Sequence, residues 1–152
     1  MIRVIAVGSI KEAALKEGIK EYLKRLSAFT PIEIVEIKEV TNKTINQNIE
    51  NEGLAILSKI ASNDFVITLE IEGKMLTSEE LSEKISSLLT YGNSRIAFVI
   101  GGSNGLSDKV KLRSNLALSL SRLTFPHQWV RLMLMEQLYR VYTIFNNHDY
   151  HK

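Results

Sequence analysis

The sequence contains no cysteine, and this absence excludes several kinds of chemistry. Its 152 residues can form no disulfide, bind no metal through thiolates and supply no cysteine nucleophile. The absence is also compatible with a reducing compartment, where disulfides rarely persist. Metal or redox chemistry based on thiols is therefore excluded.

Long hydrophobic runs are also missing. The longest apolar segments are too short to span a bilayer. The first residues, Met1 to Gly8, lack the basic region, long apolar core and small-residue cleavage site of a secretory signal peptide. We therefore expect a cytoplasmic protein with no membrane attachment.

An excess of charge of one sign is likewise absent. Nineteen basic and seventeen acidic residues leave a formal net charge of +2, which permits nucleic-acid binding but hardly argues for it. Any basic surface must be local. The composition, 45% hydrophobic and 24% charged, is typical of a globular protein, and the length predicts one domain over residues 1–152.

Apolar runs rich in branched residues alternate with segments of helical period, which predicts an α/β fold with a largely parallel sheet of five to six strands. Residues 96–100 are apolar throughout, as in a central strand covered on both faces. Thr77 and Glu80 form a capping box before one helical segment. The five expected strands are Ile2–Val7, Ile32–Ile37, Phe65–Ile71, Ile96–Ile100 and Leu116–Leu120.

The last helical segment differs from the others because it is apolar on nearly every side. Pro126 suits its first turn, and apolar residues from Trp129 to Phe145 surround its axis. Such a helix must be covered on two sides. One side can pack on the sheet, and we favour a second copy of the chain on the other, although burial in a monomer core is the alternative.

A glycine-rich segment, Gly101 to Leu106, directly follows the most apolar strand. Its glycines allow a sharp turn and a close approach of backbone N–H groups to a ligand at the carboxyl end of the sheet. No Gly-Lys-Ser/Thr follows, and the dinucleotide-binding spacing G-x-G-x-x-G is absent. An ordinary turn and a ligand-binding turn are equally compatible with this segment.

The next strand-to-helix connection, residues 120–127, carries apolar side chains that suit an exposed loop poorly. Leu123 and Phe125 would be solvated unless the segment lines a pocket or packs against the core. His127 is better suited to hydrogen bonding at the start of a helix than to catalysis. Both arrangements of the loop stay open at this point.

The C-terminal segment, residues 146–152, has no apolar period. Such tails are often frayed. This one combines an aromatic ring, imidazoles and a cation, which are the groups that single-stranded RNA recognition uses. His148, Asp149 and His151 make a weak zinc pattern, so we expect no metal.

Several of these segments, taken in order, resemble one known family. These segments are Val66–Ile71, Gly73-Lys74, Ile100–Leu106, Ser119–His127, Glu136–Arg140 and Tyr150–Lys152. Through them the sequence is similar to the RlmH family, the SPOUT-class ribosomal RNA large-subunit methyltransferases H, from Ala6-Val7-Gly8 to its last residue.

This resemblance implies a fold and an activity that periodicity alone does not. The implied fold is an α/β domain whose C-terminal part forms a trefoil knot, which general topology rules would disfavour. The implied protein is a homodimer that uses S-adenosylmethionine to methylate ring nitrogen 3 of a pseudouridine in 23S rRNA of the large subunit, acting on assembled ribosomes.

The resemblance also assigns residues. His151 and Tyr150 are the implied catalytic residues, with His151 assisting removal of the imide proton, Tyr150 positioning the base and Lys152 the RNA backbone. The implied methyl-donor site consists of Leu69, Gly101, Leu120, Ser121, Arg122, Leu123, Thr124 and Phe125.

Two other functions fit the sequence less well. A ribosome-binding factor that kept the fold without catalysis would be indicated by a failure to bind S-adenosylmethionine. A nucleotide-dependent oxidoreductase would need the glycine spacing and the acidic ribose partner that this sequence lacks.

Overall fold

A single five-stranded parallel sheet forms the centre of the molecule. A computed structural model of the chain describes residues 1–92 and 95–152. Every neighbouring pair of strands runs parallel, in the order β2-β1-β4-β3-β5. The expected parallel α/β architecture is confirmed. The strands are β1 (Ile2–Val7), β2 (Ile32–Ile37), β3 (Phe65–Met75), β4 (Ile96–Ile100) and β5 (Leu116–Ser119).

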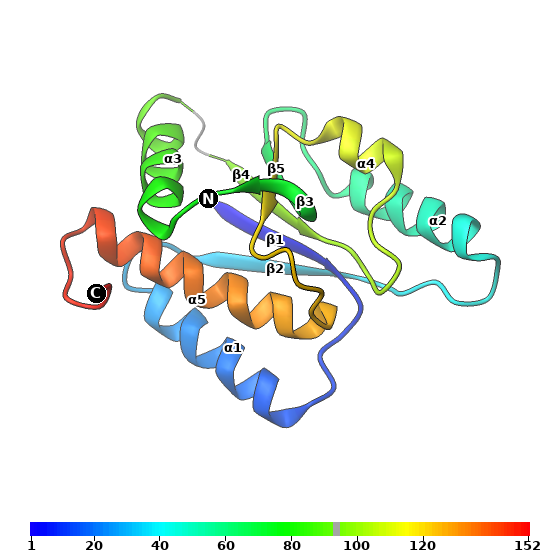
Figure 1. Ribbon diagram of the computed structural model, residues 1–152, viewed down its shortest axis with the longest axis horizontal. Helices are drawn as coiled ribbons and strands as arrows, with labels where there is room; N and C mark the ends of the chain where they lie inside the picture. Colours follow the sequence, from blue (N-terminus) through cyan, green and yellow to red (C-terminus); the bar gives the residue numbers. More distant parts are fainter. Residues whose placement is uncertain (93–94) are drawn as a thin grey trace.

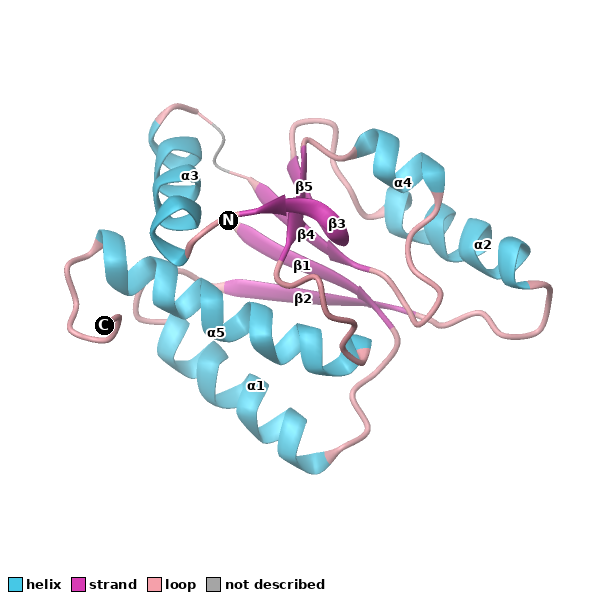
Figure 2. Ribbon diagram, viewed as in Figure 1, coloured by secondary structure: helices cyan, strands magenta, loops and turns pink. Residues whose placement is uncertain are grey.

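Helices cover both faces of the sheet (Figure 1). On one face lie α1, α3 and α5, and on the other α2 and α4, as Figure 2 also shows. All five residues of β4 are buried, as predicted for a central strand. The helices are α1 (Ala13–Leu26), α2 (Ile45–Ser58), α3 (Ser78–Thr90), α4 (Asp108–Arg113) and α5 (His127–Phe145).

Side chains of the central strands alternate between two cores. Val4 and Phe98 belong to the core beneath α1, α3 and α5, whereas Ile5 and Val99 belong to the core beneath α2 and α4. This alternation follows from the two-residue period of a strand. The sequence therefore encodes a three-layer domain with hydrophobic packing on both sheet faces.

Local signals fix where several helices begin. Thr77 accepts a hydrogen bond from the backbone N–H of Glu80, whose side chain accepts one from Thr77, so the predicted capping box is present. Thr44 and Gln47 make the same arrangement at the start of α2. Such caps satisfy N–H groups that a helix leaves without partners.

The two central strands send the chain to opposite faces of the sheet. β1 is followed by α1 on one face, and β4 by α4 on the other (Figure 1). Because β1 and β4 are neighbours, the loops after them diverge. In open parallel sheets this divergence creates a crevice at the carboxyl ends of the two strands.

β3 is longer than predicted because it continues past the sheet and crosses β5. Leu118 of β5 pairs first with Leu69 and then with Lys74, so β3 follows β5 on two separate stretches. Gly73 lies at the crossing, where a Cβ atom would come within 2.7 Å of the carbonyl carbon of Ala117. The trefoil knot implied by the resemblance stays a prediction.

Candidate active site

The residues predicted to bind the methyl donor meet at the carboxyl edge of three adjacent strands. Leu69 lies opposite Leu118 of β5, and its neighbour Thr68 lies opposite Val99 of β4. Gly101 follows β4 directly, and Leu120 follows β5. Parallel register therefore gathers these segments at one edge, the usual ligand-binding edge of such sheets.

The glycine segment forms a tight turn held by its own backbone. The Gly105 N–H donates a 3.1 Å hydrogen bond to the Gly102 carbonyl, and Gly105 has a φ of 86°. A Cβ atom at Gly101 would lie 2.9 Å from the carbonyl group of Gly105. The absence of a side chain at Gly101 is therefore required by the turn itself.

The loop after β5 is shaped by short polar contacts. The Ser119 hydroxyl donates to the Ser121 carbonyl at 3.0 Å, and the Leu123 N–H donates to the Ser121 hydroxyl at 3.0 Å. The Arg122 guanidinium donates to the carbonyl of Ile71, which ties the loop to the extension of β3.

Leu120 of this loop packs against the core, whereas the side chains of Leu123 and Phe125 do not. Leu123 is 69% exposed and Phe125 is 37% exposed. Thr124 is exposed as well, and Leu120 and Ser121 are partly exposed. The loop therefore offers the apolar surface of Leu123 and Phe125 near β3, to which Arg122 ties it, while Leu120 anchors its start to the core.

The C-terminal segment is docked against the protein rather than frayed. The ring of Tyr150 packs edge-on against Tyr139 with 4.7 Å between centroids, and the guanidinium of Arg140 lies 4.8 Å from the Tyr150 centroid. Its hydroxyl lies 3.4 Å from that of Tyr22. Burial, followed by the Tyr22 contact, raises the pKa of Tyr150 to about 12.

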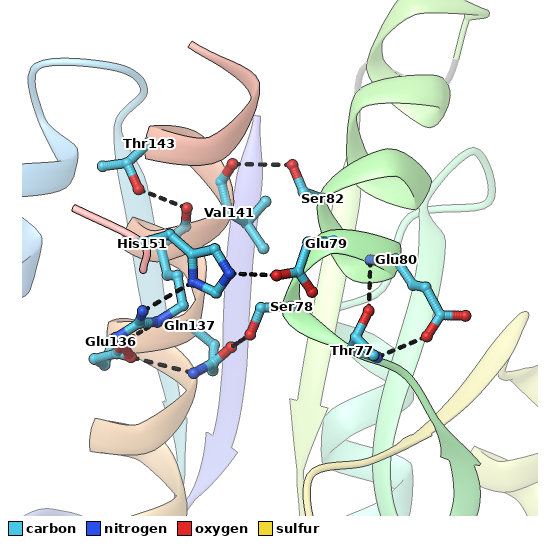
Figure 3. Close-up of polar contacts among 11 residues, drawn as sticks. Thr77, Ser78, Glu79, Glu80, Ser82, Glu136, Gln137, Val141, Thr143 and His151 are labelled. Atoms are coloured by element: carbon cyan, nitrogen blue, oxygen red, sulfur yellow. Dashed lines mark hydrogen bonds and ion pairs between the residues drawn. The ribbon is translucent and has the colours of Figure 1, made fainter. Parts of the chain in front are cut away.

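His151 joins α5 to α3, as Figure 3 shows for its contact with Glu79. Its Nδ1 accepts a 3.0 Å hydrogen bond from Arg140, and its Nε2 donates to the Glu79 carboxylate. That hydrogen bond is the main reason why the pKa of Glu79 is lowered. Both ring nitrogens of His151 are therefore engaged within the chain.

A cavity of about 480 Å³ runs along α5 between the donor loop and the docked tail. Ser119 and Leu120 line it on the β5 side. Ser78 and Gln137 line it near the tail and hydrogen-bond to each other at 2.8 Å (Figure 3). The structure thus places Leu120 on this cavity, whereas Leu69, Gly101 and residues 121–125 do not line it.

The outer surface of α5 remains partly uncovered. α1 and α3 pack on either side of α5 (Figure 1). On the inner face of α5, the side chains of Leu134, Met135 and Leu138 are fully buried. Trp129 is 46% exposed and lines the cavity together with Leu132 and Met133. The apolar surface that motivated the dimer prediction is therefore present.

Two buried charged residues near the sheet edge were not recognised from the sequence. Glu52 is 7% exposed, accepts a 3.0 Å hydrogen bond from the Val40 N–H, and has its pKa raised by burial. Arg131 is 3% exposed and bound to Glu36. Each lies on the buried face of its helix, so only a search for charges at buried helical positions could have found them.

Residues 1–92 and 95–152 contain no helix that combines the length and apolarity needed to cross a membrane. Within the same ranges, no three His, Asp or Glu side chains converge as metal ligands would.

Comparison with known proteins identifies the family. A protein-family model described as a predicted SPOUT methyltransferase matches residues 1–151. The chain belongs to the SPOUT methyltransferase family. It is 50% identical to the ribosomal RNA large subunit methyltransferase H of Bacillus pumilus (strain SAFR-032), and the alignment covers 99% of each protein. The same identity and coverage hold for the relative of that name from Pediococcus pentosaceus. These matches confirm the RlmH resemblance.

A solved structure agrees with the fold. The structure of a probable methylase family protein from Haemophilus influenzae Rd KW20 superposes with a TM-score of 0.51 and 15% sequence identity. The superposition covers 96% of this chain and 66% of that chain. At this identity the likeness supports the α/β fold alone, while the match to the family model establishes the chain as a SPOUT methyltransferase.

Proposed function

We propose that this methyltransferase transfers the methyl group of S-adenosylmethionine to ring nitrogen 3 of a pseudouridine in 23S rRNA, on assembled ribosomes in the cytoplasm. The observation that carries the proposal is the full-length match, at 50% identity, to relatives named ribosomal RNA large subunit methyltransferase H. The geometry at the sheet edge adds a plausible donor site.

The donor would bind at the carboxyl ends of β4 and β5, beside Leu69 within β3. Leu69, Leu123 and Phe125 would supply apolar walls, and the backbones of Gly101 and residues 120–125 would supply hydrogen bonds to adenine. The residues suit such a ligand because Leu123 and Phe125 offer exposed apolar side chains and the tight turn at Gly101 presents backbone without a side chain. The sulfonium supplies an activated methyl group, so the chain mainly has to hold donor and acceptor in line.

The acceptor must lose its imide proton, and His151 is our candidate for assisting that loss. In the docked tail, its Nδ1 accepts from Arg140 and its Nε2 donates to Glu79. Proton acceptance would therefore require release of the Arg140 contact. Tyr150 would position the base and Lys152 the RNA backbone, and both would need the tail to move away from Tyr139 and Arg140.

We also propose that the active form is a homodimer. The partly exposed face of α5, with Trp129, Leu132 and Met133 beside an apolar cavity, offers a surface for a second copy. Closed twofold dimers are the commonest assembly among soluble proteins. Burial of this face would complete the two-sided packing that the apolar helix requires.

The proposal is tested by transfer of a labelled methyl group from the donor to purified ribosomal particles. Wild-type protein should label the large-subunit RNA. Deletion of residues 150–152 should leave donor affinity, measured by calorimetry, nearly unchanged and should reduce labelling severely. Failure of the wild type to bind the donor would favour the non-catalytic ribosome-binding factor, and full activity of the truncated enzyme would exclude a catalytic tail.

A further inference from the structure

Two adjoining cavities lie beside the carboxyl ends of β1 and β2, and none of the proposed donor-site residues lines them. Their volumes are about 440 and 670 Å³, and Ser9, Lys11 and Glu36 line both. His127, at the start of α5, lines the smaller cavity, and Arg131, one turn later, lines the larger. The cavities therefore form one continuous hollow between β1, β2, α1 and α5.

The hollow opens beside the crevice between β1 and β4. Gly8 follows β1 and lines the smaller cavity. A Cβ atom at Gly102, in the turn after β4, would lie 3.1 Å from Val7, the last residue of β1. Open parallel sheets bind ligands at such a reversal of strand order. The hollow is thus next to the proposed donor site without sharing its residues.

Positive charge is concentrated in this hollow. Five lysine or arginine side chains and two glutamates line the two cavities, which gives them a larger net charge than the +2 of the whole chain. The acidic residues are Glu36 and Glu39. Within the described ranges, no lysine of the hollow forms an ion pair. These lysines are Lys11, Lys16, Lys20 and Lys38.

A buried arginine forms the floor of the hollow. Arg131 donates to the Gly8 carbonyl at 3.0 Å, and its Nη1 lies 2.6 Å from the Glu36 carboxylate. Its Nε is buried and has no hydrogen-bond partner. The side chain of Glu36, which is the only anion bound to this arginine among the described residues, is 47% exposed and faces the open hollow. An incoming anion can therefore compete with Glu36 for the guanidinium.

We propose that this hollow binds phosphate groups of the substrate RNA, with Lys11 and Lys38 as contacts at its rim and Arg131 as the buried cation that orients them. This inference rests on the proposed function and adds the place where the RNA backbone is held. Lysine suits a phosphate as a mobile point charge, whereas arginine offers a fixed fork of donors. Backbone contacts of this kind set the register of the RNA relative to the donor.

The first test removes the rim charges in the full-length protein. Lys11→Gln combined with Lys38→Gln is compared with a matched control, Lys24→Gln combined with Lys43→Gln, which removes the same charge from exposed positions outside both cavities. Binding to purified ribosomal particles is measured over a range of salt concentrations. The rim variant should bind about tenfold more weakly, and its salt dependence should lose about one unit of slope per lysine. The control should behave like the wild type.

The second test uses a variant that should bind ribosomes more tightly than the wild type. Glu36→Gln keeps an oxygen for Arg131 but removes the competing charge, so ribosome affinity should rise several-fold. If Glu36 and Arg131 only stabilise the fold, affinity for the particles will not rise. Donor affinity, measured by calorimetry, should be unchanged in all three variants, because the hollow shares no residue with the donor site.

The outcomes separate this inference from the proposed function. An active wild type whose rim variant keeps the wild-type salt slope and affinity would overturn the phosphate site and leave the methyltransferase activity intact. A loss of donor affinity in the rim variant would instead assign the hollow to the donor carboxylate and would also overturn the proposal. Absence of methylation by the wild type would refute the proposed function itself.

Discussion

Replacement of Gly73 by alanine tests the crossing of β3 over β5. An alanine Cβ would lie 2.7 Å from the carbonyl carbon and oxygen of Ala117 and 2.9 Å from the carbonyl carbon of Leu118. These are backbone atoms, so the contact cannot be relieved by rotating a side chain. Overpacking of this kind costs about 1 to 3 kcal/mol, which is roughly a 5- to 150-fold change in the unfolding constant.

The backbone shift that relieves the contact at Gly73 should extend to the donor loop. The pairs Lys74–Leu118 and Met75–Ser119 lie directly beside Gly73, and Arg122 is bound to the carbonyl of Ile71. We expect Gly73→Ala to lower the urea midpoint, by about 1 M for a typical m-value. We also expect it to weaken donor binding in calorimetry. All variants are compared at one protein concentration, because a dimer's stability depends on it.

Gly18→Ala provides the matched control. Its Cβ would lie 2.9 Å from Cδ1 of Leu132, the flexible end of a partly exposed side chain, and the change removes a glycine from the middle of α1. Its stability should stay the same or rise by up to about 1 kcal/mol. If Gly73→Ala kept the stability and the donor affinity of the wild type, the close approach of β3 and β5 would be refuted.

Three further outcomes follow from the structure. Sedimentation at micromolar concentration should give about twice the chain mass of 17.2 kDa, and a clean monomer would contradict the interface on α5. Absorbance titration should show one tyrosine with a pKa of about 12, absent in Tyr150→Phe. Because the folded-state pKa is raised, its contribution to stability should be complete below pH 10 and lost as the pH rises to about 12. Burial raises the pKa of Glu52, so Glu52→Gln should raise the urea midpoint at pH 7 and change it less at pH 4; equal changes at both pH values would contradict this.

Much of the fold was predictable because strands and helices of this protein carry strong local patterns. The expected strands at Ile2–Val7, Ile32–Ile37 and Ile96–Ile100 coincide with β1, β2 and β4. The predicted capping box of Thr77 and Glu80 is present at the start of α3. These features depend on residues close in sequence, which periodicity and spacing can identify.

Features that depend on residues distant in sequence were not predictable. The extension of β3 to Met75 is set by its crossing with β5, more than forty residues later. The docking of the tail rests on contacts of Tyr150 with Tyr22 and of His151 with Glu79, which no pattern within residues 146–152 indicates. α4 was not predicted because its six residues are too few to show a helical period.

The candidate site also contains both features that the sequence predicts and features that only the fold reveals. The segments after β3, β4 and β5 were recognisable from their sequence and from the resemblance to one family, and parallel register explains why they meet. The ion pair of buried Arg131 with half-exposed Glu36 joins residues 95 positions apart, so its place beside the β1–β4 crevice emerges only from the folded chain.

The central claim, methylation of a large-subunit pseudouridine, is tested most directly by identifying the product nucleoside. Purified protein, S-adenosylmethionine and ribosomes that lack the modification are combined, and the digested large-subunit RNA is analysed by mass spectrometry. We predict a single new nucleoside, pseudouridine methylated on ring nitrogen 3. A methyl group on an unmodified uridine or on a ribose, or no methylated nucleoside at all, would contradict the account.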